Sequence, residues 1–295
     1  MDIKPKIGLV VLNYNDYNTT LLFLDSVEKN RLIDFIVVVD NKSTDGSFEI
    51  LSKRETNTIK VVSTEENRGY ASGNNYGIEV LNNLINPEYI IIANPDVSFD
   101  ESYIKEMLEC FNSHKDTVAV AGVMNSSANI NNPKIAWKLP TYSDLILSNL
   151  LIMRRFVGDR TLYKESYLLS DRFVRVDVIP GSLMFLSNAP FKEVGYFDTE
   201  TFLYEEENIL SYKLLHSGYE SYIASEVSYE HNHAVSINKS IPNVGKRLDI
   251  DFKSRMIYAT KYLKIGIPKK VILFVTYYIG MFNYINCLKI RKIKR

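Results

Sequence analysis

Residues 35–47 read FIVVVDNKSTDGS, an uninterrupted apolar run that gives way at once to a polar loop. A strand that is buried on both faces of a sheet has this kind of continuous, β-branched run. The same succession occurs upstream, where residues 7–12 (IGLVVL) precede the loop NYND, and downstream, where residues 89–93 (YIIIA) precede NPD. The three runs predict parallel strands, and the polar segments after them predict a ligand site at the carboxyl ends of these strands.

Helical patterns separate the predicted strands. Two further strands are expected at residues 59–62 and 118–123, and the expected helices begin at residue 18, cover residues 48–53, end at residue 84 and cover residues 103–111. Strands that alternate with helices form βαβ units. The sequence therefore predicts an α/β fold with a mostly parallel central sheet flanked by helices.

The pattern weakens between residues 125 and 175. It contains Trp137 and the pair Arg154-Arg155, which are candidates for an acceptor region, with a purely structural role as the alternative. Regular patterns return at residues 176–179, at residues 183–186 and in a predicted helix over residues 204–217.

Composition limits the class of protein. The 295 residues include 35 Lys and Arg against 35 Asp and Glu, and 46% of them are apolar. These values predict one large folded domain, alone or with a short appendage, and argue against nucleic acid as the partner. The first residues show no targeting signal, and Cys110 and Cys287 fit no metal pattern, so we expect reduced cysteines and a cytoplasmic protein.

Two polar segments have the chemistry that a nucleotide sugar requires. Asp40 could accept hydrogen bonds from a uracil or thymine N–H or from ribose hydroxyls, although a helix cap is the alternative. Residues 67–77 (NRGYASGNNYG) open a helix, where Gly69 and Gly73 would let the backbone approach a diphosphate and Arg68 could pair with it. This segment is neither GxGxxG nor a P-loop, and an ordinary Gly-rich connection is its alternative.

Further along the chain, carboxylates and imidazoles could hold a metal ion and accept a proton. Asp96 could bind Mg²⁺ or Mn²⁺, cations that commonly take only one or two protein carboxylates beside phosphates. His231 and His233 could complete the shell, although a surface histidine is the ordinary interpretation. One carboxylate of the acidic run 205–207 could be a general base, or the run could only stabilise a helix N-terminus.

In their order along the chain, six segments together resemble glycosyltransferase family 2, especially its bacterial rhamnosyltransferase-like branch. They are residues 10–15 (VVLNYN), 37–47, 67–77, 94–97 (NPDV), 180–184 (PGSLM) and 197–218. The resemblance covers about residues 5–240 and implies a GT-A fold, a Rossmann-like nucleotide-diphospho-sugar transferase fold. It implies a transferase domain at residues 1–240 and leaves residues 241–295 as a C-terminal helical extension.

The resemblance also implies a donor-binding set. Its members are Asn13, Tyr14, Asp40, Asn67, Arg68, Gly69, Gly73, Asn74, Asn94 and Asp96. Within the set, Asn13 and Tyr14 would flank the base. The sequence departs from the family where the acidic metal motif reads NPD, with one carboxylate only, and where Ile209 occupies a later acidic position.

Catalytic and metal roles carry over in the same way. Asp96 matches the metal-binding acid, and either His231 or His233 matches a C-terminal histidine near the diphosphate. Glu207 matches the position of the base, with Glu206 as the fallback.

The resemblance implies an inverting, metal-dependent glycosyltransferase with Mg²⁺ or Mn²⁺ as cofactor. The expected donor is a UDP- or dTDP-sugar, the sugar a hexose or deoxyhexose such as rhamnose, and the acceptor a polysaccharide or lipid-linked oligosaccharide of a cell surface. Two other functions stay open, a non-catalytic nucleotide-sugar-binding subunit and a sugar-phosphate nucleotidyltransferase. A homo-oligomer stays open as well.

Residues 271–288 (VILFVTYYIGMFNYINCL) carry no charge and lie between basic flanks. A spanning helix needs about 20 apolar residues, and this run is interrupted by polar ones. An aromatic-rich helix with basic flanks is typical of the membrane interface, so we expect a peripheral contact with the inner face of the cell membrane. A helix packed on the core or on a second subunit, and a spanning helix, are the alternatives.

Overall fold

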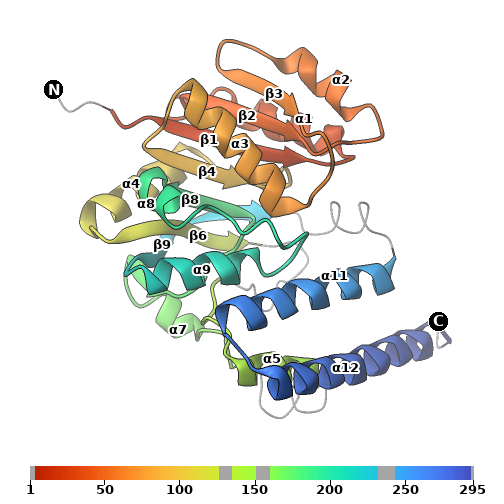
Figure 1. Cartoon of the computed structure of the whole chain (residues 1–295). Coiled ribbons are helices and arrows are strands. Elements are labelled where there is room, and N and C mark those ends of the chain that lie inside the picture. Colours follow the sequence, from red (N-terminus) through yellow and green to blue (C-terminus); the bar gives the residue numbers. More distant parts are fainter. Residues whose placement is uncertain (1–3, 126–134, 151–159, 232–242, 294–295) are drawn as a thin grey trace.

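Figure 1 shows the computed structural model, which describes residues 4–125, 135–150, 160–231 and 243–293, with side chains of the last helix described as far as Ile285. The strands are β1 Ile7–Asn13, β2 Phe35–Asp40, β3 Ile59–Ser63, β4 Tyr89–Ala93, β5 Val97–Ser98, β6 Thr117–Asn125, β7 Phe173–Val176, β8 Leu183–Ser187 and β9 Glu220–His231. The helices are α1 Tyr17–Val27, α2 Ser47–Leu51, α3 Tyr70–Leu84, α4 Glu101–Ser113, α5 Tyr142–Asn149, α7 Glu165–Leu168, α8 Asn188–Glu193, α9 Glu206–His216, α11 Val244–Ile257 and α12 Ile267–Ile293. A 3-10 helix, η1 Ser52–Arg54, follows α2, and a π-helix, η2 Tyr258–Tyr262, follows α11.

In the described part of the chain, nine strands form one sheet in the order β3-β2-β1-β4-β8-β6-β9-β5, and β7 also pairs with β9. Strands β3, β2, β1 and β4 are parallel, as their apolar runs predict. The register sets Asn13 opposite Asp40 and Val11 opposite Ala93. The polar segments that follow β1, β2 and β4 therefore lie at one edge of the sheet.

The other half of the sheet is mixed rather than parallel. β8 runs antiparallel between β4 and β6, and β5 and β7 are both antiparallel to β9. An apolar run that is buried on both faces looks the same in either direction, so the sequence could not reveal the reversal at β8. Two predicted bounds also shift, because β7 ends at Val176 instead of beginning there, and α9 begins at Glu206.

Helices cover both faces of the sheet (Figure 1). Successive residues of β1 belong to different apolar clusters. One apolar cluster joins Leu9 and Val11 of β1 to side chains of α1, α2 and α4. The other joins Val10 to side chains of α3, α8 and α9. The molecule thus has helical layers on either side of the sheet, whose strands β1, β4 and β8 are almost entirely buried.

Helix α3 lies unusually close to the sheet because it has glycines on its inner face. A Cβ atom at Gly77 would lie 2.5 Å from Cγ1 of Val10 and 2.7 Å from Cγ2 of Val39. At Gly73 it would lie 2.5 Å from Cδ1 of Leu12. Close packing on β1 and β2 requires a small residue at both positions, and the place of Gly73 in the donor-binding set stays a prediction.

The helical extension packs on the rest of the molecule through α5 and α9. A third apolar cluster contains Leu145, Ile209, Tyr258, Ala259, Ile265 and Leu273. A Cβ atom at Gly280 would lie 2.1 Å from the carbonyl oxygen of Asn149, so α12 and α5 touch at the backbone. No helix in the described ranges is long and apolar enough to cross a membrane.

Candidate active site

The carboxyl ends of β1 and β2 form a buried polar pair. Nδ2 of Asn13 donates to Oδ1 of Asp40 at 2.9 Å, and both side chains are buried. The hydroxyl of Thr20 on α1 donates to Oδ1 of Asn13 at 2.8 Å, and the N–H of Ser43 donates to Oδ2 of Asp40 at 3.0 Å. Sheet register and loop together fix the Asp40 carboxylate where the sequence predicts the base-binding group.

The segment that leads into α3 is tied to the end of β2. Nδ2 of Asn41 donates to Oδ1 of Asn67 at 3.0 Å and to the carbonyl oxygen of Gly69 at 3.2 Å. The hydroxyl of Thr64 donates to Oδ1 of Asn41 at 3.1 Å. Asn41 thus organises the Gly-rich segment beside Asp40. Asn41 lies within one of the six matching segments, although it is not a member of the predicted donor-binding set.

Gly69 marks a close approach between this segment and the chain that leads into α9. Its φ is +94°, and a Cβ atom there would lie 2.0 Å from the carbonyl oxygen of Phe202. The N–H of Tyr70 donates to the same carbonyl at 2.9 Å. Backbone conformation and contact both require glycine here.

The remaining residues of the predicted donor set are placed as follows. Asn74 is buried in α3, where Nδ2 donates to the carbonyl oxygen of Tyr70 at 3.0 Å. Tyr14 is partly exposed just after β1. The side chain of Arg68 is 68% exposed and lies 3.6 Å from Glu66. Their contacts with a donor stay predictions.

Asp96 and His231 come from distant parts of the chain and meet at the end of the sheet. β5 pairs antiparallel with β9, which sets Val97 opposite His231. Nε2 of His231 lies 3.2 Å from Oδ1 of Asp96, with the two side chains only 6% and 7% exposed. His233 lies outside the described residues.

A carboxylate oxygen and an imidazole nitrogen form a donor set that fits Mg²⁺ or Mn²⁺. Across the described ranges, no group of three or more His, Cys, Asp and Glu residues gathers where it could hold a metal ion. Asp96 and His231 are the two side chains that would hold such an ion here, with diphosphate oxygens completing the shell.

The acidic run enters α9 through an unusual backbone. Tyr204 and Glu205 have φ values of +73° and +66°, the left-handed region that non-glycine residues rarely adopt. Burial, and then the charge on Glu207, raises the pKa of Glu206 well above its ordinary value. Glu207 is half-buried, and a Cβ atom at Gly181 would lie 2.6 Å from its Oε1. Glu207 therefore faces the backbone that precedes β8.

Tyr229 is buried in β9, two residues before His231. Its hydroxyl and Oγ of Ser182 share a hydrogen bond of 2.7 Å. Its pKa is raised by burial and by the charges of Glu207 and Asp96. The charges of both carboxylates thus contribute to the raised pKa of Tyr229.

Tyr70 connects the start of α3 to the same place. Its hydroxyl donates to the carbonyl oxygen of Gly181 at 2.8 Å, and its pKa is raised by burial and then by the charge of Glu207. The N–H of Asn94 donates to the carbonyl oxygen of Ser182 at 2.8 Å. Residues 181–182 therefore contact residues from α3, from the end of β4, from β9 and from α9.

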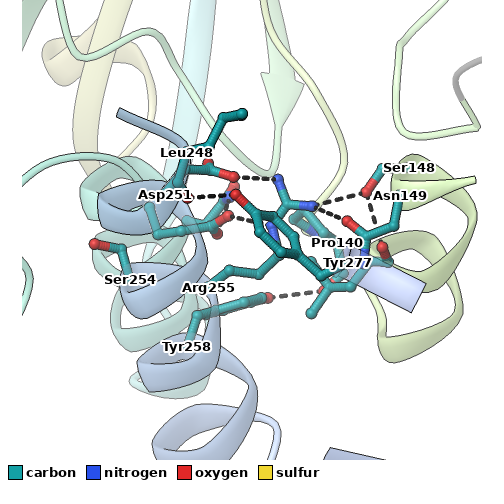
Figure 2. A network of polar contacts seen from close by, with 12 residues as sticks. Pro140, Ser148, Asn149, Leu248, Asp251, Ser254, Arg255, Tyr258 and Tyr277 are labelled. Carbon is teal, nitrogen blue, oxygen red and sulfur yellow. Dashed lines mark hydrogen bonds and ion pairs between the residues drawn. The ribbon is translucent and has the colours of Figure 1, made fainter. Parts of the chain in front are cut away.

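Arg255 of α11 ties the helical extension to the start of α9 (Figure 2). Nη1 donates to Oδ1 of Asn149 at 2.7 Å and to Oγ of Ser148 at 3.1 Å, and Nη2 lies 3.4 Å from Oδ2 of Asp251. Nε lies 3.6 Å from Oε1 of Glu205, and both side chains are largely buried. Burial raises the pKa of Glu205, and the positive charge of Arg255 opposes this rise.

Hydrogen bonds to backbone surround this ion pair (Figure 2). Tyr258 donates to the carbonyl oxygen of Pro140 at 2.8 Å, and Tyr277 donates to that of Leu248. The network could not be predicted from sequence, because Arg255 lies outside the six matching segments and its partners lie on α5, on α11 and just before α9.

Trp137 belongs to the same network. Its Nε1 donates to Oδ1 of Asn208 at 2.8 Å, and Nδ2 of Asn208 donates to Oε2 of Glu205 at 2.7 Å. These contacts favour the structural alternative for Trp137. The pair Arg154-Arg155 lies outside the described residues.

A family model described as glycosyl transferase family 2 matches residues 9–171, more than half of the chain. The chain belongs to glycosyltransferase family 2. The matched residues include Asp40 and Asp96, whereas Glu207 and His231 lie beyond them.

A family 2 relative comes from Haloferax volcanii, the low-salt glycan biosynthesis hexosyltransferase Agl10. It is 27% identical over 177 residues, which are 60% of this chain and 52% of Agl10. The chain therefore spans about half the length of this curated relative.

Solved structures share the fold. Mannosyltransferase PcManGT from Pyrobaculum calidifontis, in complex with GDP-Man and Mn²⁺, has a TM-score of 0.59 at 16% identity, covering 94% of this chain and 70% of its own. TarS 1–349 from S. aureus, in complex with UDP-GlcNAc, has a TM-score of 0.59 at 16% identity, covering 95% and 73%. GalNAc-T7 with UDP, GalNAc and Mn²⁺ has a TM-score of 0.61 at 13% identity, covering 95% and 56%. The predicted GT-A fold of this family 2 protein is confirmed.

Proposed function

We propose that this family 2 protein transfers a hexose or deoxyhexose from a UDP- or dTDP-sugar to a saccharide or lipid-linked acceptor, with inversion. The observation that carries the proposal is that Glu207 lies against Gly181, whose neighbour Ser182 accepts a hydrogen bond from the N–H of Asn94, two residues before Asp96. This place is at the edge of the sheet where Asp40 also lies. A nucleotide, its diphosphate and a reacting hydroxyl each require one of these three carboxylates.

The donor nucleotide would bind across the ends of β1 and β2. Asp40 receives one hydrogen bond on each oxygen, from Asn13 and from Ser43, and each oxygen has a second lone pair for a base N–H or a ribose hydroxyl. Because these contacts are buried and come from rigid elements, the carboxylate is already oriented before the donor arrives.

The diphosphate would bind beside Asp96 and His231. These residues would hold Mg²⁺ or Mn²⁺, which when bound offsets the negative charge of the leaving nucleoside diphosphate. The complexes of PcManGT and GalNAc-T7 contain Mn²⁺, which supports a divalent cation here.

Glu207 is the proposed base. The acceptor hydroxyl oxygen bonds to the anomeric carbon while the bond from that carbon to the diphosphate oxygen breaks, and the hydroxyl proton passes to Glu207. Attack opposite the leaving group inverts the anomeric configuration. Because the pKa of Glu206 is raised, Glu206 keeps its proton to a higher pH than an ordinary glutamate, which limits the charge beside the base.

The finer substrate proposal rests on sequence. The six matching segments together resemble the rhamnosyltransferase-like branch, which supports a deoxyhexose such as rhamnose. Agl10 is described as a hexosyltransferase of glycan biosynthesis, which supports a glycan acceptor. A cytoplasmic site, at the inner face of the cell membrane, would give access to both nucleotide sugars and lipid-linked acceptors.

A donor screen tests the proposal. The purified chain, with Mg²⁺ or Mn²⁺, is incubated with UDP-, dTDP- and GDP-sugars, and nucleoside diphosphate release is followed with and without a membrane lipid extract. We expect release from one UDP- or dTDP-sugar, stimulated by the extract, lost in Asp96→Asn and retained in Asp116→Asn, a change at an exposed aspartate before β6.

Two outcomes would contradict the proposal. Tight binding of one donor without release from any would favour a non-catalytic nucleotide-sugar-binding subunit. Pyrophosphate release from a nucleoside triphosphate and a sugar phosphate would favour a nucleotidyltransferase.

A further inference from the structure

Helix α12 has two apolar faces, and the molecule covers one of them. Leu273 and Tyr277 on the inner face are buried, and Gly280 touches the backbone of α5. The outer face leaves large apolar side chains in contact with solvent, among them Phe282 at 66% exposure and Val271 at 56%. Together with α5, α12 forms the end of the molecule opposite α2 and β3 (Figure 1).

The exposed side chains form one continuous stripe. Along the described part of α12 they are Ile267, Val271, Ile272, Phe274, Val275, Tyr278, Ile279 and Phe282. Most of them recur at intervals of three and four residues, which puts them on one side of a helix. Single exposed apolar residues such as Leu22 on α1 are ordinary, whereas a stripe of this length marks a binding surface.

The charged residues that flank the apolar run indicate what kind of surface binds the exposed stripe. From residue 265 to residue 295 the sequence contains no Asp or Glu, but it has Lys269-Lys270 before the apolar run and five Lys or Arg residues after it. At the beginning of α12, Lys269 is exposed and Lys270 is half-buried. Nearby Lys253 is paired with Asp249 at 2.8 Å, so it adds little net charge.

A second copy of the same face is a poor occupant. In either a parallel or an antiparallel helix pair, basic ends would lie against basic ends, because both ends of the apolar run are basic. An anionic lipid surface complements both features at once, since its headgroups meet the lysines and its acyl boundary takes up the aromatic and aliphatic side chains.

We infer that the outer face of α12 binds an anionic membrane surface, with the helix lying in the plane of the interface. The inner contacts with α5 remain in place, so binding needs no rearrangement of the core. The inference does not depend on the proposed transferase activity, and it can succeed or fail separately.

Vesicle co-sedimentation of the full chain tests the inference. The lipids are phosphatidylcholine alone or mixed with phosphatidylglycerol. We expect binding to the mixed vesicles, weakening as salt is raised, and little binding to phosphatidylcholine alone. The double variant Lys269→Gln/Lys270→Gln should weaken binding about 25-fold, at about fivefold per lysine. The variant Phe282→Ser, at a side chain that is 66% exposed, should weaken it by a similar factor. Phe274 is left in place because its ring packs on that of Phe252 in α11.

Leu22→Ser is the matched control, since it removes an exposed apolar side chain elsewhere and should leave binding unchanged. Circular dichroism and thermal melting check that each variant folds. The inference is overturned if the wild type ignores anionic vesicles, or if the phenylalanine variant binds them as well as the control. A dimer in solution that only the phenylalanine variant abolishes, without vesicle binding, would assign the face to a second copy and also overturn it.

Discussion

Nε2 of His231 lies 3.2 Å from Oδ1 of Asp96, and the two residues are held there by strand pairing rather than by a local motif. β5 contains only two residues, Val97 and Ser98, so its place depends on its partner β9. The candidate metal ligands therefore depend on a contact between segments that are far apart in sequence.

Removal of the imidazole tests this pair. His231→Ala should lower the affinity for Mn²⁺ in the presence of a nucleoside diphosphate, by at least the roughly 10–100-fold that loss of an outer-shell partner causes. Calorimetric titration with Mn²⁺ measures the effect. His216→Ala, at an exposed histidine on α9, is the control. Equal Mn²⁺ affinity in all three proteins would rule out His231 as a ligand.

The buried carboxyl of Glu206 should make stability depend on pH. Its folded pKa is raised by burial and by Glu207, so its contribution is fully present below the unfolded pKa and is lost as pH rises through the folded pKa. Glu206→Gln removes this loss. Between pH 5 and pH 8, the melting temperature of Glu206→Gln should therefore rise relative to that of the wild type. The expected rise is about 2–4 °C for each kcal/mol of unfolding free energy that the wild type loses. Exposed Glu79→Gln should show no such gain, and parallel pH profiles for Glu206→Gln and wild type would contradict the assignment.

Alanine variants at two glycines can distinguish the cost of backbone strain from the cost of a steric clash. Gly195 has φ +79° with no atom within 4 Å of a built Cβ, so Gly195→Ala should cost about 1–2 kcal/mol of unfolding free energy. Gly69→Ala adds a clash with the carbonyl oxygen of Phe202 and should cost more than about 3 kcal/mol. Denaturant unfolding measures both. Equal costs would mean that the approach of Gly69 to Phe202 is not a constraint.

The Arg255–Glu205 ion pair should couple the helical extension to α9. A double-mutant cycle of Arg255→Met and Glu205→Gln should give a coupling of about 1–3 kcal/mol in unfolding free energy. Because Arg255 acts through Glu205, Arg255→Met should lower kcat with little change in donor affinity, and Arg255→Lys should restore part of it. Additive free energies and an unchanged kcat would leave the pair without this positioning role.

Much of the donor side of the site could be predicted from sequence. The runs before Asn13, Asp40 and Asp96 are long, β-branched and followed by polar residues, so both the strands and the shared edge follow from composition and from the rules of parallel sheets. The structure places these side chains at that edge, as expected.

Other features could not be predicted, because they depend on tertiary contacts. The direction of β8 and the packing of Gly73 on Leu12 cannot be read from the spacing of apolar residues along the chain. From sequence alone, Gly73 is expected to let the backbone approach a phosphate. The contacts of Arg255 cannot be read from that spacing either, because its partners lie on helices α5 and α11 and at the start of α9.

The most direct test of the central claim is the kinetics of Glu207→Gln with the donor that the screen identifies. The account predicts a fall in turnover of about 10²–10⁴-fold with donor affinity retained, because only the proton acceptor is lost. Glu79→Gln should behave as wild type. Turnover in Glu207→Gln equal to that of the control would contradict the account.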